Sequence, residues 1–302
     1  MDEQAAGGNG SRRVIVDPDD PRLADFRSLN DPAGRKAMEE REAIFVVEGR
    51  LAVDRLVETD HRIRALLIED RKEPSARDLI EAVLAQGAPV YVGSRQVVHA
   101  TVGFALHRGV VAVAQRPSAV EPMDVLVAAA GTSDGARSLP VVAVLEGLND
   151  HENVGALFRN AAAFGVAGVL GDPTCADPLY RRSVRVSMGH VLHVPFARLD
   201  PWPAGLELVR DAGFLVVALA PHSTHPETPA MTLAEVATVA SSRHRVEGLK
   251  GVALLLGAEG PGLSEAALAS ADVTASIPMA SGVDSLNVAT AAAVAFHALR
   301  NG

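Results

Sequence analysis

Near-continuous apolar segments in the C-terminal half of the chain place the strongest limit on its fold. Four segments contain almost no polar residue and are strand candidates: 141–145, 168–170, 214–220 and 251–257. Stretches with helical spacing lie between and after them: 154–164, 202–212, 264–269 and 288–299. Strands that are apolar on both faces are typical of a parallel sheet covered by helices on both sides. We therefore predict an α/β domain over residues 141–302.

A smaller α/β domain is predicted over residues 21–116. Its strand candidates are 45–49, 63–70, 89–93 and 109–114, and its helical stretches are 33–42, 51–58 and 76–86. Residues 1–20 are rich in Gly, Asp and Pro without a sustained apolar period, which predicts a flexible tail. Residues 117–140 contain the small and polar run AAAGTSDGARS, which is typical of a linker.

The composition excludes several kinds of site. The single cysteine, Cys175, excludes a disulfide framework and a multi-cysteine metal centre. The histidines have no cysteine or carboxylate at ligand spacing beside them, so no metal site is expected. The sequence contains no phosphate loop, no dinucleotide fingerprint and no G-x-S-x-G nucleophile turn. No run of about 18 apolar residues occurs, so we expect a cytoplasmic protein without a membrane span or secretory signal.

The charge balance points away from binding of bulk nucleic acid. The chain has 37 acidic and 28 basic residues, a net charge of −9, whereas affinity for bulk nucleic acid depends on neutralised phosphates. One local exception is the stretch 180–190, where Arg181 and Arg185 share a helix face and Arg182 adjoins them. These arginines are either a solvated helix face or a phosphate contact. An acidic chain with a local arginine cluster suits recognition of one folded feature.

Two loops after predicted strands carry residues that could take part in binding or catalysis. In parallel sheets, ligands bind at the carboxyl ends of strands. Asn153 lies at the entrance of the helix after the first strand and Arg159 lies farther along that helix, although a cap and a solvent-facing arginine explain them equally. Glu259 follows the strand 251–257 among three glycines and a proline, a composition that lets backbone approach a ligand and also suits a tight turn.

A third loop precedes the C-terminal Ala-rich helix. Ser285 and Asn287 lie in it, and each could simply cap that helix or turn the chain.

Together, the three loops resemble the signature motifs of the SpoU (TrmH-type) family of RNA ribose 2′-O-methyltransferases, which belong to the SPOUT class. The motif N-x-G-x-x-x-R-x-A corresponds to Asn153, Gly155, Arg159 and Ala161. The motif G-x-E-G-x-G-L corresponds to Gly257, Glu259, Gly260, Gly262 and Leu263. The motif I-P-M…S-L-N-V corresponds to residues 277–279 and 285–288. The three motifs occur in the expected order within a C-terminal unit, which makes chance resemblance improbable.

The resemblance implies a fold and a cofactor. It implies that the C-terminal α/β domain is tied in a trefoil knot, a rare exception to the rule against knots. It implies a homodimer with its active site at the subunit interface, and S-adenosylmethionine as the cofactor. The residues expected to contact the cofactor are Gly257, Ile277 and Leu286, with Leu219 and Met279 as weaker additions. The segments 45–58 and 106–114 resemble the ribosomal-protein-like, substrate-binding domain that precedes the catalytic domain in ribosomal-RNA members.

The resemblance also assigns catalytic residues. Arg159 matches the arginine that is essential in the family, for which a general-base role is proposed. Because a guanidinium with a pKa above about 12 is almost never neutral, we favour stabilisation of the developing alkoxide or a grip on the adjacent phosphate. Asn153 and Glu259 are expected to orient Arg159 and the loops. Ser285 and Asn287 are expected to hold the RNA phosphate or shape the cofactor loop.

The stretch with Arg181, Arg182 and Arg185 resembles the basic helix of the family, which favours contact with the RNA backbone. The N-terminal domain favours ribosomal RNA as the substrate. The alternatives within the class are a transfer-RNA methyltransferase and a methyltransferase that protects the ribosome from an antibiotic. A non-catalytic RNA-binding dimer and a metabolic enzyme with a nucleotide cofactor are the alternatives from other classes.

Overall fold

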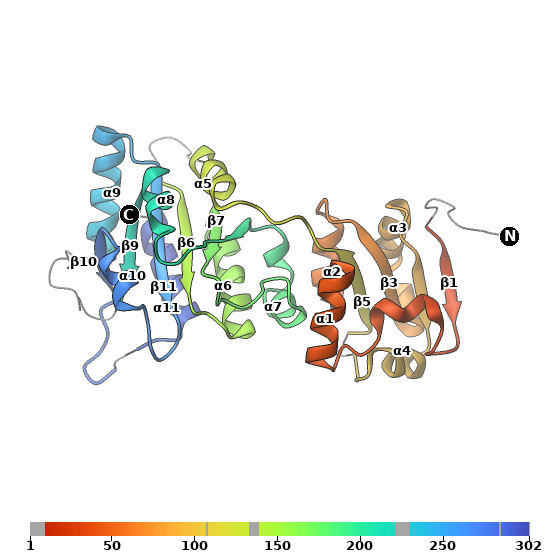
Figure 1. The fold of residues 1–302 in the computed structure, drawn as a ribbon. Coiled ribbons are helices and arrows are strands. Elements are labelled where there is room, and N and C mark those ends of the chain that lie inside the picture. Colours follow the sequence, from red (N-terminus) through yellow and green to blue (C-terminus); the bar gives the residue numbers. More distant parts are fainter. Residues whose placement is uncertain (1–9, 107, 133–138, 221–229, 284, 302) are drawn as a thin grey trace. The chain divides into compact units, whose positions relative to one another are not determined.

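A computed structural model of the protein describes residues 10–106, 108–132, 139–220, 230–283 and 285–301. The chain forms two compact units (Figure 1). The first unit contains Met1–Ser118 and Leu179–Leu192, and the second contains Ala119–Pro178 and His193–Gly302. The segment Leu179–Leu192 therefore groups with the first unit, whereas the predicted boundaries place it in the C-terminal domain. No described helix is long and apolar enough to cross a membrane.

The first unit is built on a mixed five-stranded sheet in the order β1-β4-β3-β5-β2. The strands are β1 (Arg12–Ile15), β2 (Ile44–Glu48), β3 (Ile63–Glu69), β4 (Val90–Gly93) and β5 (Val110–Gln115). β1, β4 and β3 are parallel, and β5 is antiparallel to both β3 and β2. The helices are α1 (Pro32–Glu42), α2 (Arg50–Val57), α3 (Arg77–Ala85), α4 (Arg95–Val102) and α7 (Arg181–Val186), with short 3₁₀ helices at Pro21–Phe26, Asp70–Ser75 and His190–Leu192.

The prediction of a flexible tail over residues 1–20 is wrong for its second half. Residues 12–15 form β1, which pairs with β4 in parallel register, and Ile15 is buried. β1 lies at the edge of the sheet, so it has one neighbouring strand and buries only one of its four side chains. A short edge strand of this kind leaves no sustained apolar period in the sequence. Residues 1–9 of the predicted tail lie outside the described part of the chain.

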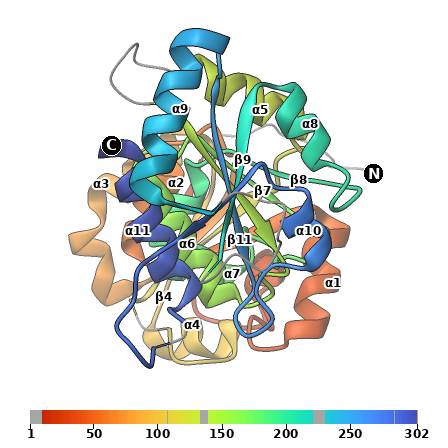
Figure 2. The ribbon, with the colours of Figure 1, turned by 90° about the vertical axis from the view of Figure 1, so that its left-hand side faces the viewer.

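The second unit is built on a seven-stranded parallel sheet in the order β10-β12-β9-β11-β6-β7-β8. The strands are β6 (Val141–Glu146), β7 (Gly168–Gly171), β8 (Phe196–Arg198), β9 (Phe214–Leu219), β10 (Ala230–Thr232), β11 (Gly251–Gly257) and β12 (Val273–Ser276). One face is covered by α5 (Pro122–Gly131), α8 (Leu206–Asp211) and α10 (Glu265–Ala269) (Figure 2). The other is covered by α6 (His151–Ala163), α9 (Leu233–Glu247) and α11 (Val288–Asn301). The predicted parallel sheet with helices on both sides is confirmed, while the trefoil knot stays a prediction.

The prediction of a linker over residues 117–140 is wrong in its middle. Residues 122–131 form α5, and Val125, Leu126 and Ala129 are buried against the sheet of the second unit. These three apolar residues have helical spacing, but the small and polar run that follows them hides the pattern. Residues 133–138 lie outside the described part of the chain.

The parallel sheet determines where the three sequence motifs meet. The first motif follows β6, the second follows β11 and the third follows β12. β6 and β11 are direct neighbours, with Glu146 opposite Gly257 at their carboxyl ends. Because all these strands run in one direction, their following loops lie at one edge of the sheet.

Candidate functional site

Asn287 joins the three motifs. Its Nδ2 donates a hydrogen bond to Asn153 Oδ1 at 2.9 Å and another to Glu259 Oε1 at 2.5 Å. Its Oδ1 accepts hydrogen bonds from the backbone N–H groups of Ala289 and Thr290, at 3.0 and 3.2 Å. Asn287 therefore caps α11, as its simplest interpretation predicts, and also connects the loops after β6 and β11. One side chain holds residues that are 134 and 28 positions away in the sequence.

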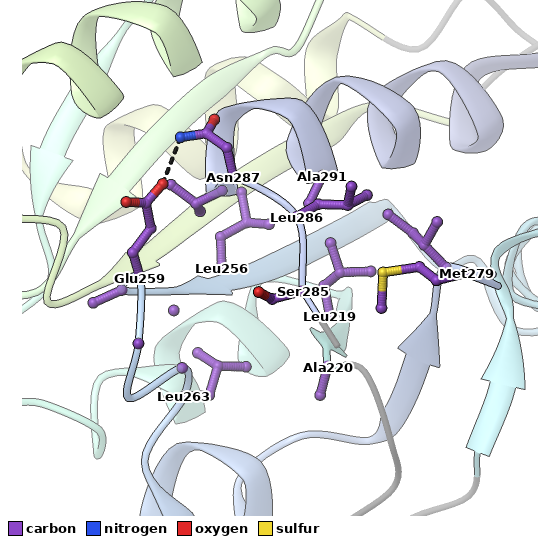
Figure 3. A pocket seen from close by; sticks show the side chains of 16 residues that line it. Leu219, Ala220, Leu256, Glu259, Leu263, Met279, Ser285, Leu286, Asn287 and Ala291 are labelled. Atoms are coloured by element: carbon purple, nitrogen blue, oxygen red, sulfur yellow. Dashed lines mark hydrogen bonds between the residues drawn. The ribbon is translucent and has the colours of Figure 1, made fainter. Parts of the chain in front are cut away.

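A cavity of about 440 Å³ lies between the second and third motifs. All five residues predicted to contact the cofactor line this cavity: Leu219, Gly257, Ile277, Met279 and Leu286. Three predicted catalytic residues line it as well: Glu259, Ser285 and Asn287. Figure 3 shows Glu259 and Asn287 joined at one end of this cavity, which we call the first cavity, and Met279 near the other end.

The lining of the first cavity is mostly aliphatic side chains and glycine backbone. Leu219, Leu256 and Ile277 belong to the aliphatic part. Among the described residues that line it, Glu259 is the only charged one. An apolar pocket with a few fixed polar groups is the usual form of a site for a small organic ligand, and its volume lies within the common range of about 300–1,000 Å³.

The glycines after β11 let the loop fold back on the end of the strand. Gly262 N–H donates to the carbonyl of Ala258 at 3.0 Å. Gly260 and Gly262 have φ values of 87° and 72°, in the left-handed region that favours glycine. A Cβ atom on Gly257 would lie 2.2 Å from the backbone carbon of Gly262. The close approach therefore requires glycine at position 257.

A second cavity, of about 630 Å³, lies beside the first. Ala258, Glu259, Gly262 and Leu263 line both cavities, so the loop after β11 is their shared wall. The second cavity is also lined by polar residues at the end of β6, in the loops after β6 and β7 and in the first turn of α6: Glu146, Asn149, Asp150, Asn153, Asp172 and Thr174. Its described lining contains no Lys or Arg. This polar and acidic lining suits hydroxyl and N–H donors better than a phosphate.

The structure does not bring Arg159 to the other motif residues. It lies in α6, is exposed, and lines neither cavity. Among the described residues it has no hydrogen-bond or ion-pair partner. Within one chain the side chains of Asn153 and Glu259 both bond to Asn287, so their expected role in orienting Arg159 stays a prediction. Six residues, about one and two-thirds helical turns, separate Asn153 from Arg159, so the two side chains lie about 240° apart around α6.

Two of the three arginines of α7 pair with Glu48 of β2, within the first unit. Arg181 Nη1 donates to Glu48 Oε2 at 2.7 Å, and its guanidinium carbon lies 4.7 Å from the ring centroid of Phe104. Glu48 is buried, with 4% of its side chain exposed. Arg185 lies 3.9 Å from the same carboxylate. Arg182 is exposed and has a contact of its own. These residues form one cluster, and Arg181 also anchors α7 to β2.

Residues that the motifs did not reveal also shape the site. Glu146 could be found in the sequence as the first polar residue after an apolar segment. Trp202 and Ser264, which bond to it, belong to no motif and have no feature in the sequence that marks them. Burial raises the pKa of Cys175 to about 12, helped by the Asp172 carboxylate beside it, so this thiol is not a nucleophile at neutral pH. Among the described residues, no group of three or more His, Cys, Asp or Glu is arranged to hold a metal ion.

Comparisons with known proteins identify both units. Residues 140–297 match the model of the SpoU rRNA methylase family, and residues 46–120 match that of the RNA 2′-O ribose methyltransferase substrate-binding domain. The chain is 46% identical over 283 residues to an uncharacterized tRNA/rRNA methyltransferase of Mycobacterium bovis, covering 94% of this chain and 90% of the relative. It is 29% identical to the 23S rRNA (guanosine-2′-O-)-methyltransferase RlmB of Shewanella oneidensis, covering 87% of this chain and 98% of the relative.

A crystal structure of an AdoMet-bound rRNA methyltransferase from Sinorhizobium meliloti has the same fold. Its TM-score is 0.73 at 23% identity, and the match covers 96% of this chain and 97% of the other. The fold, the two matched domains and the high identity to a curated relative agree with the three motifs. The chain therefore belongs to the SpoU rRNA methylase family of RNA methyltransferases.

Proposed function

We propose that the protein transfers a methyl group from S-adenosylmethionine to a ribose 2′-hydroxyl of ribosomal RNA. The observation that carries this proposal is the pair of cavities with a shared wall built from the second motif. One cavity suits the cofactor and the other suits a hydroxyl-bearing acceptor. The relative RlmB is named as a guanosine 2′-O-methyltransferase of 23S rRNA. Its name supports a ribose 2′-hydroxyl as the methyl acceptor and ribosomal RNA as the substrate.

The residues of the first cavity fit S-adenosylmethionine. When bound, the cofactor supplies an electrophilic methyl group on a positively charged sulfur. The aliphatic side chains Leu219, Ile277 and Leu286 would cover its adenine, and the backbone at Gly257 would approach it closely. Glu259 complements a positive charge because it is the only charged residue in the described lining.

The chain's residues orient the two reactants. Asn287 fixes Glu259 and Asn153, one on the shared wall and the other on the acceptor side, so both cavities keep a set geometry. Orientation of this kind accounts for much of the rate of an in-line transfer in a site that excludes water. Ser285 lines the first cavity and would hold the RNA phosphate or shape the cofactor loop.

Arg159 would complete the site from a second copy of the chain. Its guanidinium is exposed and lacks a partner among the described residues, while the second cavity lacks a cation in its described lining. In a homodimer, the Arg159 of one protomer would meet the cavities of the other and stabilise the developing alkoxide or the adjacent phosphate. Because the chain is acidic apart from a local arginine cluster, it would bind one folded RNA feature and not bulk nucleic acid. It would act in the cytoplasm.

The choice between ribosomal and transfer RNA can be tested by mapping. We expect cells that lack the gene to lose one 2′-O-methylation in large-subunit ribosomal RNA, and purified protein with S-adenosylmethionine to restore it in vitro. A loss confined to transfer RNA would favour the transfer-RNA alternative. Acquired antibiotic sensitivity of the ribosome would identify a protective methyltransferase. A protein that does not bind S-adenosylmethionine at millimolar concentration would be a non-catalytic RNA-binding dimer or a metabolic enzyme.

The arginines of α7 provide a prediction about RNA affinity. Replacing Arg181, Arg182 and Arg185 with alanine is expected to weaken binding of all RNAs by a similar factor, because backbone contacts do not distinguish sequences. Each lost phosphate contact should flatten the slope of log affinity against log salt by about 0.7–0.9. Titration of RNA at several salt concentrations measures both effects. Glu48→Gln is the matched control, since it breaks the ion pair with Arg181 but keeps the three arginines. An equal loss in Glu48→Gln would assign the effect to the packing of α7.

A further inference from the structure

The last residue of β6, Glu146, gathers three hydrogen bonds on one carboxylate. Its Oε1 accepts from Trp202 Nε1 at 2.6 Å and from the Ser264 hydroxyl at 2.6 Å. Its Oε2 accepts from the backbone N–H of Ser264 at 2.8 Å. Bonds from neutral donors to a charged carboxylate are stronger than bonds between neutral groups. The carboxylate thus fixes the position of Ser264 relative to the end of β6.

This contact closes the loop that forms the shared wall of the two cavities. Gly257, at the start of the loop, lies opposite Glu146 in the sheet, and Ser264, at its end, bonds to the Glu146 side chain. The residues on both sides of the loop 258–263 are therefore held by Glu146. The wall between the cavities is made of Ala258, Glu259, Gly262 and Leu263.

The helix after the loop does not need Glu146. The hydroxyl oxygen of Ser264 already accepts the N–H of Ala267 at 3.1 Å, which caps α10. Ser264 therefore caps α10 with its own hydroxyl group, without help from Glu146. The carboxylate of Glu146 adds a constraint on the loop before Ser264, on the side of the cavities.

We propose that Glu146 is a positioning residue that holds the shared wall in the geometry needed to bind S-adenosylmethionine, and that Trp202 reports on that wall. This inference rests on the proposed function. Glu146 acts through Ser264, since the cofactor cavity is lined by the loop and not by Glu146 itself. Trp202 is the only tryptophan in the sequence, and its indole N–H shares Oε1 with the Ser264 hydroxyl. A shift of the loop when the cofactor binds would change that hydrogen bond and hence the tryptophan emission.

Glu146→Gln tests the proposal with little change in volume. The glutamine carbonyl can still accept from Trp202, but its amide nitrogen is a donor that would face the N–H of Ser264. We expect the affinity for S-adenosylmethionine, measured by calorimetry, to fall about tenfold, the loss of one hydrogen bond to a charged group. We expect the change in Trp202 emission on cofactor addition to disappear. The thermal unfolding midpoint should change by only a few degrees, because Glu146 is not part of the apolar core and Trp202 would stay packed against that core.

A double-mutant cycle shows whether Glu146 acts through Ser264. Ser264→Ala alone should weaken cofactor binding by a smaller factor, since the backbone N–H still reaches Oε2. Added to Glu146→Gln, it should cost little more, because the two residues act as a unit. Glu265→Gln is the matched control: this neighbouring carboxylate is exposed and lines neither cavity. It should bind the cofactor like the wild type.

The outcomes separate this inference from the proposed function. If the wild type binds no S-adenosylmethionine, the proposed function fails. If the wild type binds it and Glu146→Gln binds it equally well with an unchanged Trp202 response, the positioning role is overturned. If Glu146→Gln lowers the unfolding midpoint but leaves affinity and emission response intact, the residue has only a structural role, which also overturns the proposal.

Discussion

Replacing Arg159 with alanine is expected to lower kcat for RNA methylation by about a hundredfold to a thousandfold, the usual cost of removing one group that stabilises a developing oxyanion. Affinity for S-adenosylmethionine should stay unchanged, because Arg159 does not line the first cavity, where we propose that the cofactor binds. The fold should also stay intact, since Arg159 is exposed and has no partner among the described residues. Steady-state kinetics with saturating RNA, together with calorimetry of cofactor binding, measures the two effects separately.

Two further variants sharpen this prediction. Arg159→Lys keeps the charge but loses the planar pair of donors, so it should remain severely impaired if the guanidinium grips an oxygen with two bonds. Arg159→Lys with nearly full turnover and unchanged RNA affinity would contradict this bidentate role. Arg245→Ala is the control: this exposed arginine of α9 lines neither cavity and should leave turnover unchanged.

The sequence predicts the second unit well because its elements are regular. Each of the strands β6, β7, β9 and β11 is close to a predicted apolar segment, since burial on both faces removes polar residues from a parallel strand. The same regularity explains why the motif loops meet, because parallel strands end at one edge. The meeting point at Asn287, however, could not be predicted from spacing, since its partners are Asn153 in α6 and Glu259 in the loop after β11.

The errors have physical causes as well. The sequence does not predict β1 and α5, because each buries only a few apolar residues beside polar neighbours, so the local pattern is weak although the packing is specific. Glu146 and Trp202 are 56 positions apart, and neither belongs to a motif. The separation of Asn153 from Arg159, by contrast, follows from the sequence, because six residues place them about 240° apart around a helix. A site shared between two copies would not be visible in the periodicity of one sequence.

Gly257→Ala is expected to lower the affinity for S-adenosylmethionine by about a hundredfold, which corresponds to about 3 kcal/mol of overpacking in the wall of the cavity. The added Cβ would lie 2.2 Å from the backbone carbon of Gly262 and 2.4 Å from the nitrogen of Leu263. Both are backbone atoms, so no side-chain rotation can relieve the clash and the loop must move. Calorimetry with S-adenosylmethionine measures the loss, and kcat should fall with it.

A second glycine provides the control. Gly248, at the end of α9, has a φ of 74°, and a Cβ atom added to it would meet no other atom within 4 Å. Gly248→Ala therefore strains the backbone by about 1 kcal/mol without a clash and should leave cofactor affinity unchanged. If Gly257→Ala bound the cofactor like Gly248→Ala, the close approach of the loop would have no part in forming the cavity.

The two inactive variants together test whether the site is shared between protomers. Gly257→Ala damages the cofactor cavity but keeps Arg159, and Arg159→Ala does the reverse. If Arg159 acts on the partner's cavity, a mixed dimer contains one intact site, because the cavity of one protomer meets the arginine of the other. Equal amounts that exchange freely should then regain about a quarter of the wild-type activity, since half of the dimers are mixed and each holds one working site of two. If Arg159 acts within its own chain, every site lacks one component and mixing restores nothing.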